Sequence, residues 1–141
     1  MVFKTVGEIT ITNNLYAKED STAYAVAVKL LLTSFQVMPV LDYTGKVVGK
    51  VSEMDLLKVL KTGKNLKTVR IGEIMLPAPP VITTEIPLDQ AVDLIDANHL
   101  MQLPVMRNGR FIGSVTRHDL LRAWLGIRVD HERGIYTEVI G

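Results

Sequence analysis

GRFIGSVTRHDLL, residues 109–121, repeats a stretch that the chain already contains as GKVVGKVSEMDLL, residues 45–57. Six of the thirteen aligned positions are identical, and three more exchange residues of one physical type. Each copy reads as a Gly-bearing turn, a short apolar strand, the pattern Gly-x-x-Ser/Thr-x-x-Asp, and paired leucines that begin a helix. One structural unit is therefore encoded twice in this chain.

The duplication extends upstream of this stretch. FQVMPV at 35–40 matches LMQLPV at 100–105 with an offset of 65 residues, and the offset falls to 64 after the next turn. Loops absorb such single-residue changes at low cost, so the shift fits two copies of one unit. We predict repeat 1 over 5–62, a linker over 63–69, repeat 2 over 70–126, and a tail over 127–141 that forms a hairpin or an added edge strand.

Both repeats have the same predicted order of strand, helix, strand, strand, helix. Ser21 is the expected N-cap of the first long helix in repeat 1, and Pro87 suits the first helical position in repeat 2. The last helix of each repeat should end near Gly63 or Gly126, because glycine fits a left-handed cap. The predicted strands are 15–18, 37–41 and 47–51 in repeat 1 and 81–83, 103–107 and 111–115 in repeat 2, the last two of each repeat forming a hairpin.

Composition excludes several classes of function. Of the 141 residues, 48% are apolar and 22% charged, and a net charge of +1 provides no field to attract nucleic acid or an anionic membrane. The absence of cysteine removes disulfides, thiolate nucleophiles and thiolate metal sites, and it favours a cytoplasmic location. The three histidines lack the spacing of a metal site, so we expect no metal. No nucleophile with an adjacent base is present, so we expect no enzyme activity.

The repeated features together resemble a CBS-domain pair, also called a Bateman module. They are the proline-bearing strands MPV and LPV, the glycine-bearing hairpin, and Gly-x-x-Ser/Thr-x-x-Asp-Leu-Leu, all in the same order in both copies. The resemblance covers roughly residues 5–125. It implies an α+β (α/β) fold in which two β-α-β-β-α repeats pack through their sheets with pseudo-two-fold symmetry and leave two clefts at the interface. It also implies a homodimer, since such modules usually pair into disc-shaped dimers.

The resemblance further implies an adenosine-containing ligand, such as AMP, ADP, ATP or S-adenosylmethionine. In members that bind one, the aspartate of the motif holds the ribose hydroxyls, the preceding Ser or Thr assists, and strand residues read the adenine. The positions implied for repeat 1 are Ala17, Lys18, Val37, Met38, Pro39, Lys50, Ser52 and Asp55. Those for repeat 2 are Ile82, Thr83, Gln102, Leu103, Pro104, Thr116, Arg117, His118 and Asp119.

The residues of the motif allow two interpretations. An ionised carboxylate that accepts from two vicinal hydroxyls makes charge-assisted hydrogen bonds, each worth about 1.5 to 3 kcal/mol. Ser52 with Asp55, and Thr116 with Asp119, also have the spacing of a capping box, in which the acid only stabilises the helix start. Repeat 2 is the favoured ligand site, because Arg117 and its neighbour oppose the helix dipole unless an anion is bound there.

The sequence thus predicts a regulatory module that binds an adenosine-containing metabolite between the repeats and signals to an unidentified protein partner. It requires no cofactor, and we expect contact with neither nucleic acid nor membrane. The alternative is a structural or dimerisation module without a ligand, in which the motif acids are helix caps.

Overall fold

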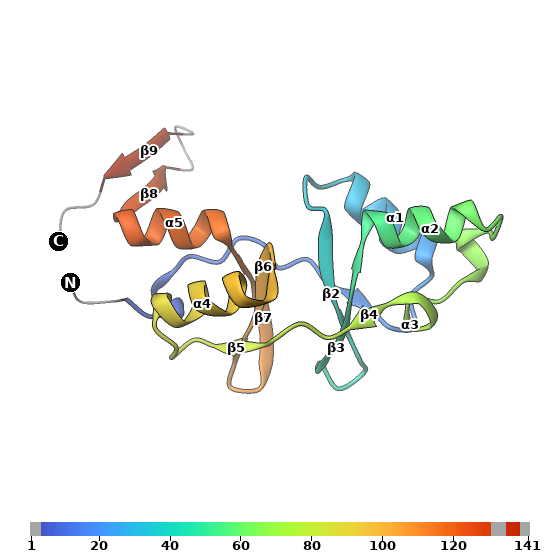
Figure 1. The fold of residues 1–141 in the computed structure, drawn as a ribbon, viewed down its shortest axis with the longest axis horizontal. Helices are drawn as coiled ribbons and strands as arrows, with labels where there is room; N and C mark the ends of the chain where they lie inside the picture. Colours follow the sequence, from blue (N-terminus) through green and yellow to red (C-terminus); the bar gives the residue numbers. More distant parts are fainter. Residues whose placement is uncertain (1–3, 131–134, 139–141) are drawn as a thin grey trace. The chain divides into compact units, whose positions relative to one another are not determined.

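The computed structural model describes residues 4–130 and 135–138 and divides into two compact units (Figure 1). The repeat-1 unit contains Leu15–Pro79 and Asn108–Phe111. The repeat-2 unit contains the chain up to Asn14, Pro80–Arg107 and the chain from Ile112 onward. The segment that precedes the first strand of repeat 1 therefore folds with repeat 2. The boundaries predicted above follow the duplication in the sequence, whereas the contacts divide the chain differently.

The repeat-1 unit is built on a four-stranded sheet in the order β1–β2–β3–β4. β1 (Ala17–Lys18) runs parallel to β2 (Val37–Leu41), and β3 (Val47–Ser52) is antiparallel to both β2 and β4 (Leu76–Pro77). Along β3, buried and partly exposed residues alternate, as expected for a strand with one covered face. The helices are α1 (Ala23–Leu31), α2 (Glu53–Lys61), the 3₁₀ turn η2 (Leu66–Thr68) and α3 (Ile71–Ile74).

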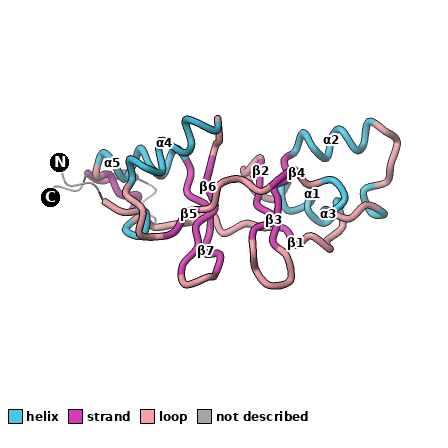
Figure 2. The backbone as a smooth tube through the Cα atoms, turned by 60° about the horizontal axis from the view of Figure 1, so that its bottom comes forward, coloured by secondary structure: helices cyan, strands magenta, loops and turns pink. Residues whose placement is uncertain are grey.

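The core of the repeat-1 unit lies between its sheet and its two longer helices, which cover the same side of the sheet (Figure 2). Val26 and Leu30 lie four residues apart on α1 and are both buried, so they share one helix face. They pack in one cluster with Leu56 of α2 and with Met38 and Val40 of β2. This is the spacing of an amphipathic helix with one covered face.

The repeat-2 unit has the same element order on a three-stranded sheet, β5–β6–β7. β5 (Ile82–Thr83) is parallel to β6 (Gln102–Arg107), and β7 (Arg110–Thr116) follows after a two-residue turn. Asn108 and Gly109 form that turn with φ values of 51° and 76°, as a type I′ hairpin requires. The helices are the 3₁₀ turn η1 (Val6–Glu8), α4 (Leu88–Asn98) and α5 (Arg117–Leu125). The α+β class and the repeat order β-α-β-β-α are thus confirmed.

Two predicted helix starts were wrong by one residue. Thr22, not Ser21, is the N-cap of α1, and its hydroxyl accepts a hydrogen bond from the Ala25 N–H at 3.1 Å. Pro87 is the N-cap of α4 and lies before the first helical residue. At the other end, Gly126 is the left-handed cap of α5 with φ of 70°, as predicted.

One glycine in each repeat lies where another segment of the chain crosses its strand. At Gly113 of β7, a Cβ atom would lie 2.5 Å from Ile11 Cγ2 and 2.8 Å from the Asn13 carbonyl oxygen. At the equivalent Gly49 of β3, it would lie 2.6 Å from Met75 Sδ and 2.8 Å from the Leu76 carbonyl oxygen. Only glycine admits such a close backbone approach. The glycine that begins the pattern Gly-x-x-Ser/Thr-x-x-Asp is therefore required for packing in both repeats.

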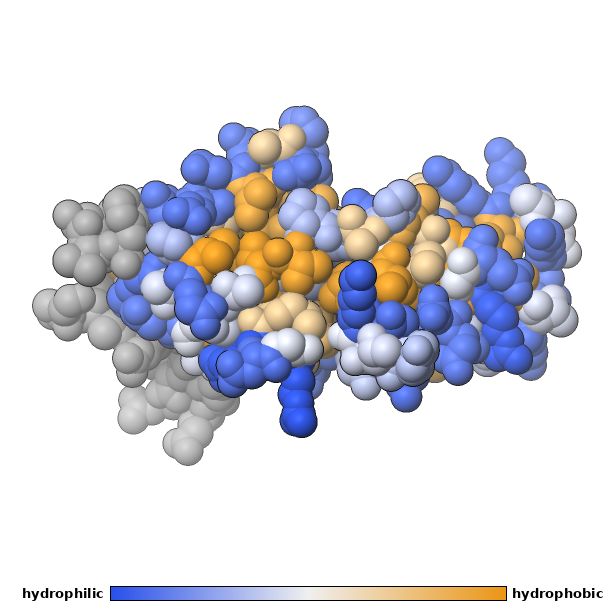
Figure 3. Space-filling model, turned by 90° about the horizontal axis from the view of Figure 1, so that it is seen from below, coloured by the Kyte–Doolittle hydropathy of each residue, from blue (hydrophilic) through white to orange (hydrophobic). Residues whose placement is uncertain are grey.

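The tail contains two short antiparallel strands, β8 (Ile127–Asp130) and β9 (Ile135–Glu138). Residues 131–134, between the two strands, lie outside the described residues. Within the described part of the chain, no helix combines the length and apolarity needed to cross a bilayer. Figure 3 shows hydrophobic residues reaching the surface between hydrophilic ones on the face that it draws.

Candidate functional site

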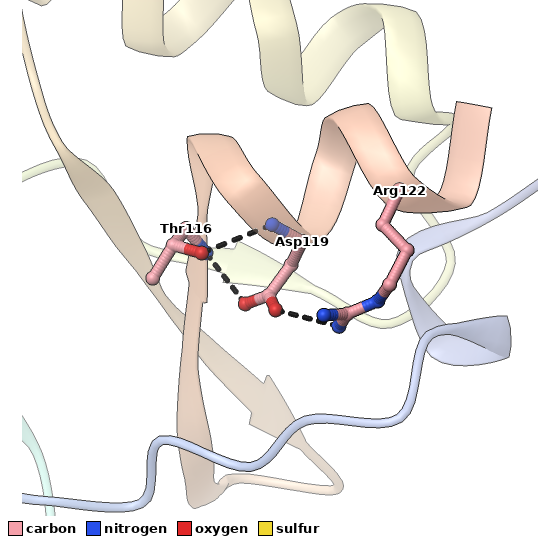
Figure 4. A network of polar contacts seen from close by, with 3 residues as sticks. All are labelled: Thr116, Asp119 and Arg122. Atoms are coloured by element: carbon pink, nitrogen blue, oxygen red, sulfur yellow. Dashed lines mark hydrogen bonds and ion pairs between the residues drawn. The ribbon is translucent and has the colours of Figure 1, made fainter. Parts of the chain in front are cut away.

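The motif of repeat 2 forms a polar network at the start of α5 (Figure 4). Asp119 is 5% exposed, and its Oδ2 accepts a hydrogen bond from the Thr116 N–H at 2.9 Å. The Asp119 N–H in turn donates to the Thr116 hydroxyl at 3.0 Å. The second carboxylate oxygen, Oδ1, accepts from Arg122 Nη2 at 2.8 Å. Both oxygens of this acid are therefore already engaged within the chain.

The motif of repeat 1 has the same capping box and a more open acid. Asp55 Oδ2 accepts from the Ser52 N–H at 2.8 Å and from the Ser52 hydroxyl at 2.9 Å. Asp55 is partly exposed, and among the described residues no ion pair to it is found. Its position three residues before Lys58 matches that of Asp119 before Arg122, but only the arginine reaches the acid. Each acid thus caps its own helix in the same way, but more of the Asp55 carboxylate than of the Asp119 carboxylate remains free.

Capping does not exhaust the hydrogen-bonding capacity of either acid. An ionised carboxylate offers about four lone-pair positions. The intrachain hydrogen bonds to Asp55 use one oxygen and those to Asp119 use both, so each acid retains acceptor positions for hydroxyl donors. At each site the positive dipole of the helix start lies beside the acid. This arrangement can hold a sugar diol and a nearby anion.

Arg117 and His118 occupy the first two positions of α5, and both residues are exposed. The Arg117 backbone N–H donates to the Met101 carbonyl at 3.2 Å, which ties the helix start to the beginning of β6. The Arg117 guanidinium has no hydrogen bond or ion pair among the described residues and lines a groove between α4 and α5. The equivalent position in repeat 1 is Glu53, so only repeat 2 presents a cation there.

The structure brings most of the predicted repeat-1 residues to one end of the β2–β3 ladder. Val37 pairs with Ser52, and Pro39 pairs with Lys50. The buried Met38 lies between them along β2. These residues are therefore neighbours of Asp55, which follows Ser52 on α2.

Ala17 and Lys18 lie nearer the other end of that ladder. Lys18 is beside Leu41, four residues along β2 from Val37, a separation of about 13 Å at the usual rise of a strand. Lys18 and Leu41 line a hollow of about 470 Å³ together with Asp42. A hydrogen bond from the Thr44 hydroxyl holds the pKa of the exposed Asp42 carboxyl below its ordinary value of 3.8.

The predicted repeat-2 residues are distributed in the same way. Leu103 and Pro104 are buried in β6, while Thr83 lies beside Met106 toward the far end of that strand. Ile82, its neighbour on β5, is buried in the core. A hydrogen bond from the Thr83 hydroxyl lowers the pKa of the Glu85 carboxyl.

Three polar residues near this site were missed by the sequence analysis. Arg122 could have been found, because an acid and an arginine three residues apart on a helix are a recognised pair. Asn13 and Ser114 are buried, and the Asn13 side chain donates to Gln102 Oε1 at 3.2 Å. The Ser114 N–H donates to the Asn13 carbonyl at 2.7 Å, whereas its hydroxyl has no hydrogen-bond partner among the described residues. No local pattern predicts this cluster, because Asn13 lies in repeat 1 and Ser114 in repeat 2, about a hundred residues apart in the sequence.

The groove between α4 and α5 has a volume of about 610 Å³. Apolar side chains form most of its wall, and Asp96, His99 and Arg117 supply its polar atoms. His99 caps α4 in a left-handed conformation with φ of 51°. Among the described residues, no group of three or more His, Asp or Glu side chains has the arrangement of a metal site.

Comparison with known proteins gives a consistent set of relatives. Residues 6–62 and 71–126 each match the CBS domain family. The chain is 29% identical to the chloroplastic CBS domain-containing protein CBSX1 of Arabidopsis thaliana, over 92% of this chain and 67% of that protein. It is 31% identical to the uncharacterized protein MK0525 of Methanopyrus kandleri, over 83% of this chain and 61% of that protein. The chain thus spans about two thirds of the length of these relatives.

The matching solved structures include complexes with ligands. The crystal structure of CBSX2 in complex with AMP matches with a TM-score of 0.72 and 30% identity, covering 86% of this chain and 96% of that one. The CBS domain pair of protein MJ0100, in complex with 5′-methylthioadenosine and S-adenosyl-L-methionine, matches with a TM-score of 0.70 over 86% of this chain and 99% of that one. Its identity of 24% means that this second likeness shows the fold alone.

Proposed function

Because the chain belongs to the CBS domain family, we propose that it is a regulatory module that binds an adenosine-containing ligand, from the group AMP, ADP, ATP and S-adenosylmethionine. The observation that carries the proposal is the likeness to CBSX2, a CBS pair crystallised with AMP, at 30% identity. The ligand would lie in a cleft between the repeats, and its occupancy would be passed to a protein partner. The module needs no catalytic group, and we assign it no enzyme activity.

The residues of the two motifs support this proposal. Each repeat ends its hairpin with a hydroxyl residue and begins a helix with a carboxylate three positions on, as ribose recognition requires. Buried apolar residues precede both motifs on the paired strand, Met38 in repeat 1 and Leu103 in repeat 2.

Repeat 2 remains our preferred site for a phosphorylated ligand, and repeat 1 for a nucleoside. Arg117 is an exposed cation with no partner among the described residues, so it can pair with a phosphate at no loss of an existing contact. Asp119 would share its carboxylate between the ribose and Arg122. Asp55 has more free acceptor capacity, but Glu53 beside it disfavours an anion.

Signalling would follow from differential affinity. A ligand that contacts two packed halves shifts the population of their arrangements by the ratio of its affinities for them. We further propose a homodimer, in which such a shift would change the surface offered to the partner protein. A cytoplasmic location stays a prediction from the cysteine-free composition, and the matched relative CBSX1 is chloroplastic.

The test compares AMP with 2′-deoxy-AMP by calorimetry on the purified chain. If Asp119 holds the ribose diol, loss of the 2′-hydroxyl should weaken binding about 10- to 150-fold, the equivalent of about 1.5 to 3 kcal/mol. In Asp119→Asn the ratio between the two ligands should fall toward one, while Asp93→Asn, at an exposed position of α4, should keep it. Asp55→Asn identifies the other site in the same way. A ratio unchanged in both motif variants would reject the ribose role.

The second candidate function is a structural or dimerisation module without a ligand. It is favoured by one observation, that the carboxylates of Asp55 and Asp119 already cap their helices. On that interpretation no adenosine compound raises the melting temperature, and removal of either acid costs only stability. Binding of any of the four ligands, lost in a motif variant that stays folded, would exclude it.

A further inference from the structure

Positive charge is concentrated at the end of α2 and in the stretch that follows it. Residues 56–72 contain five cations and no acid, and the cations recur at every third position. All five are exposed. We call this stretch, residues 58–70, the basic segment, and its cations are Lys58, Lys61, Lys64, Lys67 and Arg70.

Buried residues anchor the basic segment to the core of the repeat-1 unit. Leu66 and Val69 are 7% and 4% exposed and belong to the apolar cluster of that unit. The Val69 carbonyl accepts a hydrogen bond from the Ala23 N–H at 2.7 Å, which joins the segment to the start of α1. The Asn65 side chain accepts from the Lys67 N–H at 3.0 Å. The stretch predicted as a linker is therefore packed on the fold, and its cations project from a fixed backbone.

Two of the five cations already have partners within the chain. Lys67 Nζ lies 4.8 Å from the centre of the Tyr24 ring, a cation–π contact. Arg70 Nη1 donates a hydrogen bond to the Asp20 carbonyl oxygen at 2.9 Å. The other three have no hydrogen bond or ion pair to the side chain among the described residues, and they are Lys58, Lys61 and Lys64.

Stabilisation of α2 accounts for only part of this charge. Lys58 and Lys61 lie in the last turn of α2, where a cation interacts favourably with the negative end of the helix dipole. Lys64 lies outside the helix. Like charges three positions apart on a helix also repel each other. Helix stability therefore does not explain why three unpaired cations gather without an acid.

Repeat 2 lacks this surface. The position of Lys58 is occupied there by Arg122, which is paired with Asp119 at 2.8 Å, and the position of Lys61 is occupied by Leu125. The repeat-1 unit contains ten Lys and Arg against six Asp and Glu, a net charge of +4, whereas the repeat-2 unit contains six against nine, a net charge of −3. The five cations of the basic segment account for the positive charge of the repeat-1 unit.

We propose that the basic segment binds an acidic segment of the partner protein, whose carboxylates pair with Lys58, Lys61 and Lys64. The proposal rests on the proposed function, which requires a protein partner, and it adds the surface that the partner contacts and the chemistry of the partner. Charge complementarity of this kind speeds association and selects among partners. The surface lies at the opposite end of α2 from Asp55, so the partner and the ligand contact different residues.

The composition of the basic segment favours a protein partner over nucleic acid or a membrane. Arginine is the preferred residue for bidentate contact with phosphate, and the single arginine of the segment already donates to a carbonyl. The Tyr24 ring, which could stack on a base, is in contact with Lys67. Clusters that bind anionic lipids typically contain about four to eight cations, and only three are unpaired here.

Fluorescence anisotropy with a labelled octaglutamate peptide and the full chain tests the proposal. Replacing Lys58, Lys61 and Lys64 together by glutamine should weaken binding about 5- to 100-fold, because each exposed charge pair contributes a factor of about 1.5 to 5. Arginine at the same three positions should keep the affinity within about twofold, since the charge is retained. A glutamine peptide of the same length should not bind.

The matched control removes three exposed cations from the two hairpins, by the substitutions Lys46→Gln, Arg107→Gln and Arg110→Gln. It changes the net charge equally and should keep the affinity for octaglutamate within about twofold. Equal weakening in both glutamine variants, or no binding to the unaltered chain, would overturn the proposal. A single-stranded oligonucleotide or phosphatidylserine vesicles that bound more tightly than octaglutamate at the same salt, and through the same three lysines, would also overturn it.

Failure of this proposal is separable from failure of ligand binding. Calorimetry with AMP on the triple glutamine variant reports the ligand site, which contains none of the three lysines, and its affinity should equal that of the unaltered chain. A chain that binds AMP but not octaglutamate would remove only the partner surface. A chain that binds octaglutamate through these lysines and none of the four adenosine ligands would remove only the sensor.

Discussion

Gly113→Ala should destabilise the repeat-2 unit strongly, because the added methyl group has no room. Its Cβ would lie 2.5 Å from Ile11 Cγ2 and 2.8 Å from the Asn13 carbonyl oxygen, both closer than real Cβ contacts allow. The Asn13 contact is with the backbone, which cannot turn aside as a flexible side chain would. That carbonyl also accepts the Ser114 N–H at 2.7 Å, so moving it breaks a hydrogen bond.

The expected cost combines three contributions. Gly113 has φ of 142°, and a residue with a Cβ loses about 1 to 3 kcal/mol in such a conformation. Overpacking typically adds about 1 to 3 kcal/mol. A lost hydrogen bond adds about 1 kcal/mol. Because one backbone shift can relieve part of each, we expect a loss of about 2 to 5 kcal/mol, a large part of the usual stability of a domain.

Urea unfolding followed by tryptophan fluorescence measures this loss of stability in the repeat-2 unit. The single tryptophan, Trp124, lies on α5 in the same unit as Gly113. A loss of about 3 kcal/mol lowers the midpoint by about 1.5 M at a typical slope of about 2 kcal/mol per M. Gly109→Ala is the matched control, because Gly109 lies in the same hairpin with φ of 76° and no heavy atom within 4 Å of its added Cβ.

The control separates the cost of the backbone conformation from the cost of the clash with the N-terminal segment that crosses β7. Gly109→Ala should lose only about 1 to 2 kcal/mol, the cost of a left-handed conformation. In an Ile11→Ala background the extra cost of Gly113→Ala should shrink, since one of the two close contacts is removed. Equal losses for Gly113→Ala and Gly109→Ala would refute the argument that the N-terminal segment crosses β7 at this glycine.

Three further perturbations have definite expected outcomes. Asp119→Ala should cost about 1 to 3 kcal/mol of unfolding free energy and Asp55→Ala about 0.5 to 2, because only Asp119 also loses an arginine partner; equal melting temperatures would contradict this. Ser114→Ala should be neutral or stabilising by up to about 1 kcal/mol, since the buried hydroxyl has no partner among the described residues, and a loss above about 1 kcal/mol in urea would reveal one. The Thr44 hydroxyl lowers the pKa of the Asp42 carboxyl. The hydrogen bond therefore stabilises the turn above pH 3.8, and this stabilisation is lost as the pH falls through the lowered pKa. An Asp42 titration midpoint at or above 3.8, measured by NMR, would contradict this prediction.

The sequence alone determined the repeat, the order of its elements and the chemistry of the motif. Hydrophobic periodicity and turn residues are local signals, and the duplication presented each of them twice. The capping interpretation of Asp55 and Asp119 was also available from spacing, because a cap joins residues three positions apart. The helix starts at Thr22 and Pro87 were missed by one residue, since neighbouring Ser, Thr and Pro residues offer similar caps.

Tertiary structure decided the features that depend on contacts between distant parts of the chain. The segment that ends at Asn14 belongs to the start of repeat 1 in the sequence yet folds in the unit of repeat 2, and no local pattern indicates that exchange. It explains why Gly113 cannot carry a side chain and why Asn13 is buried beside Ser114. Periodicity reports which face of an element is covered. Only the folded chain specifies which segment covers it, because that choice is made by packing across more than a hundred residues of sequence.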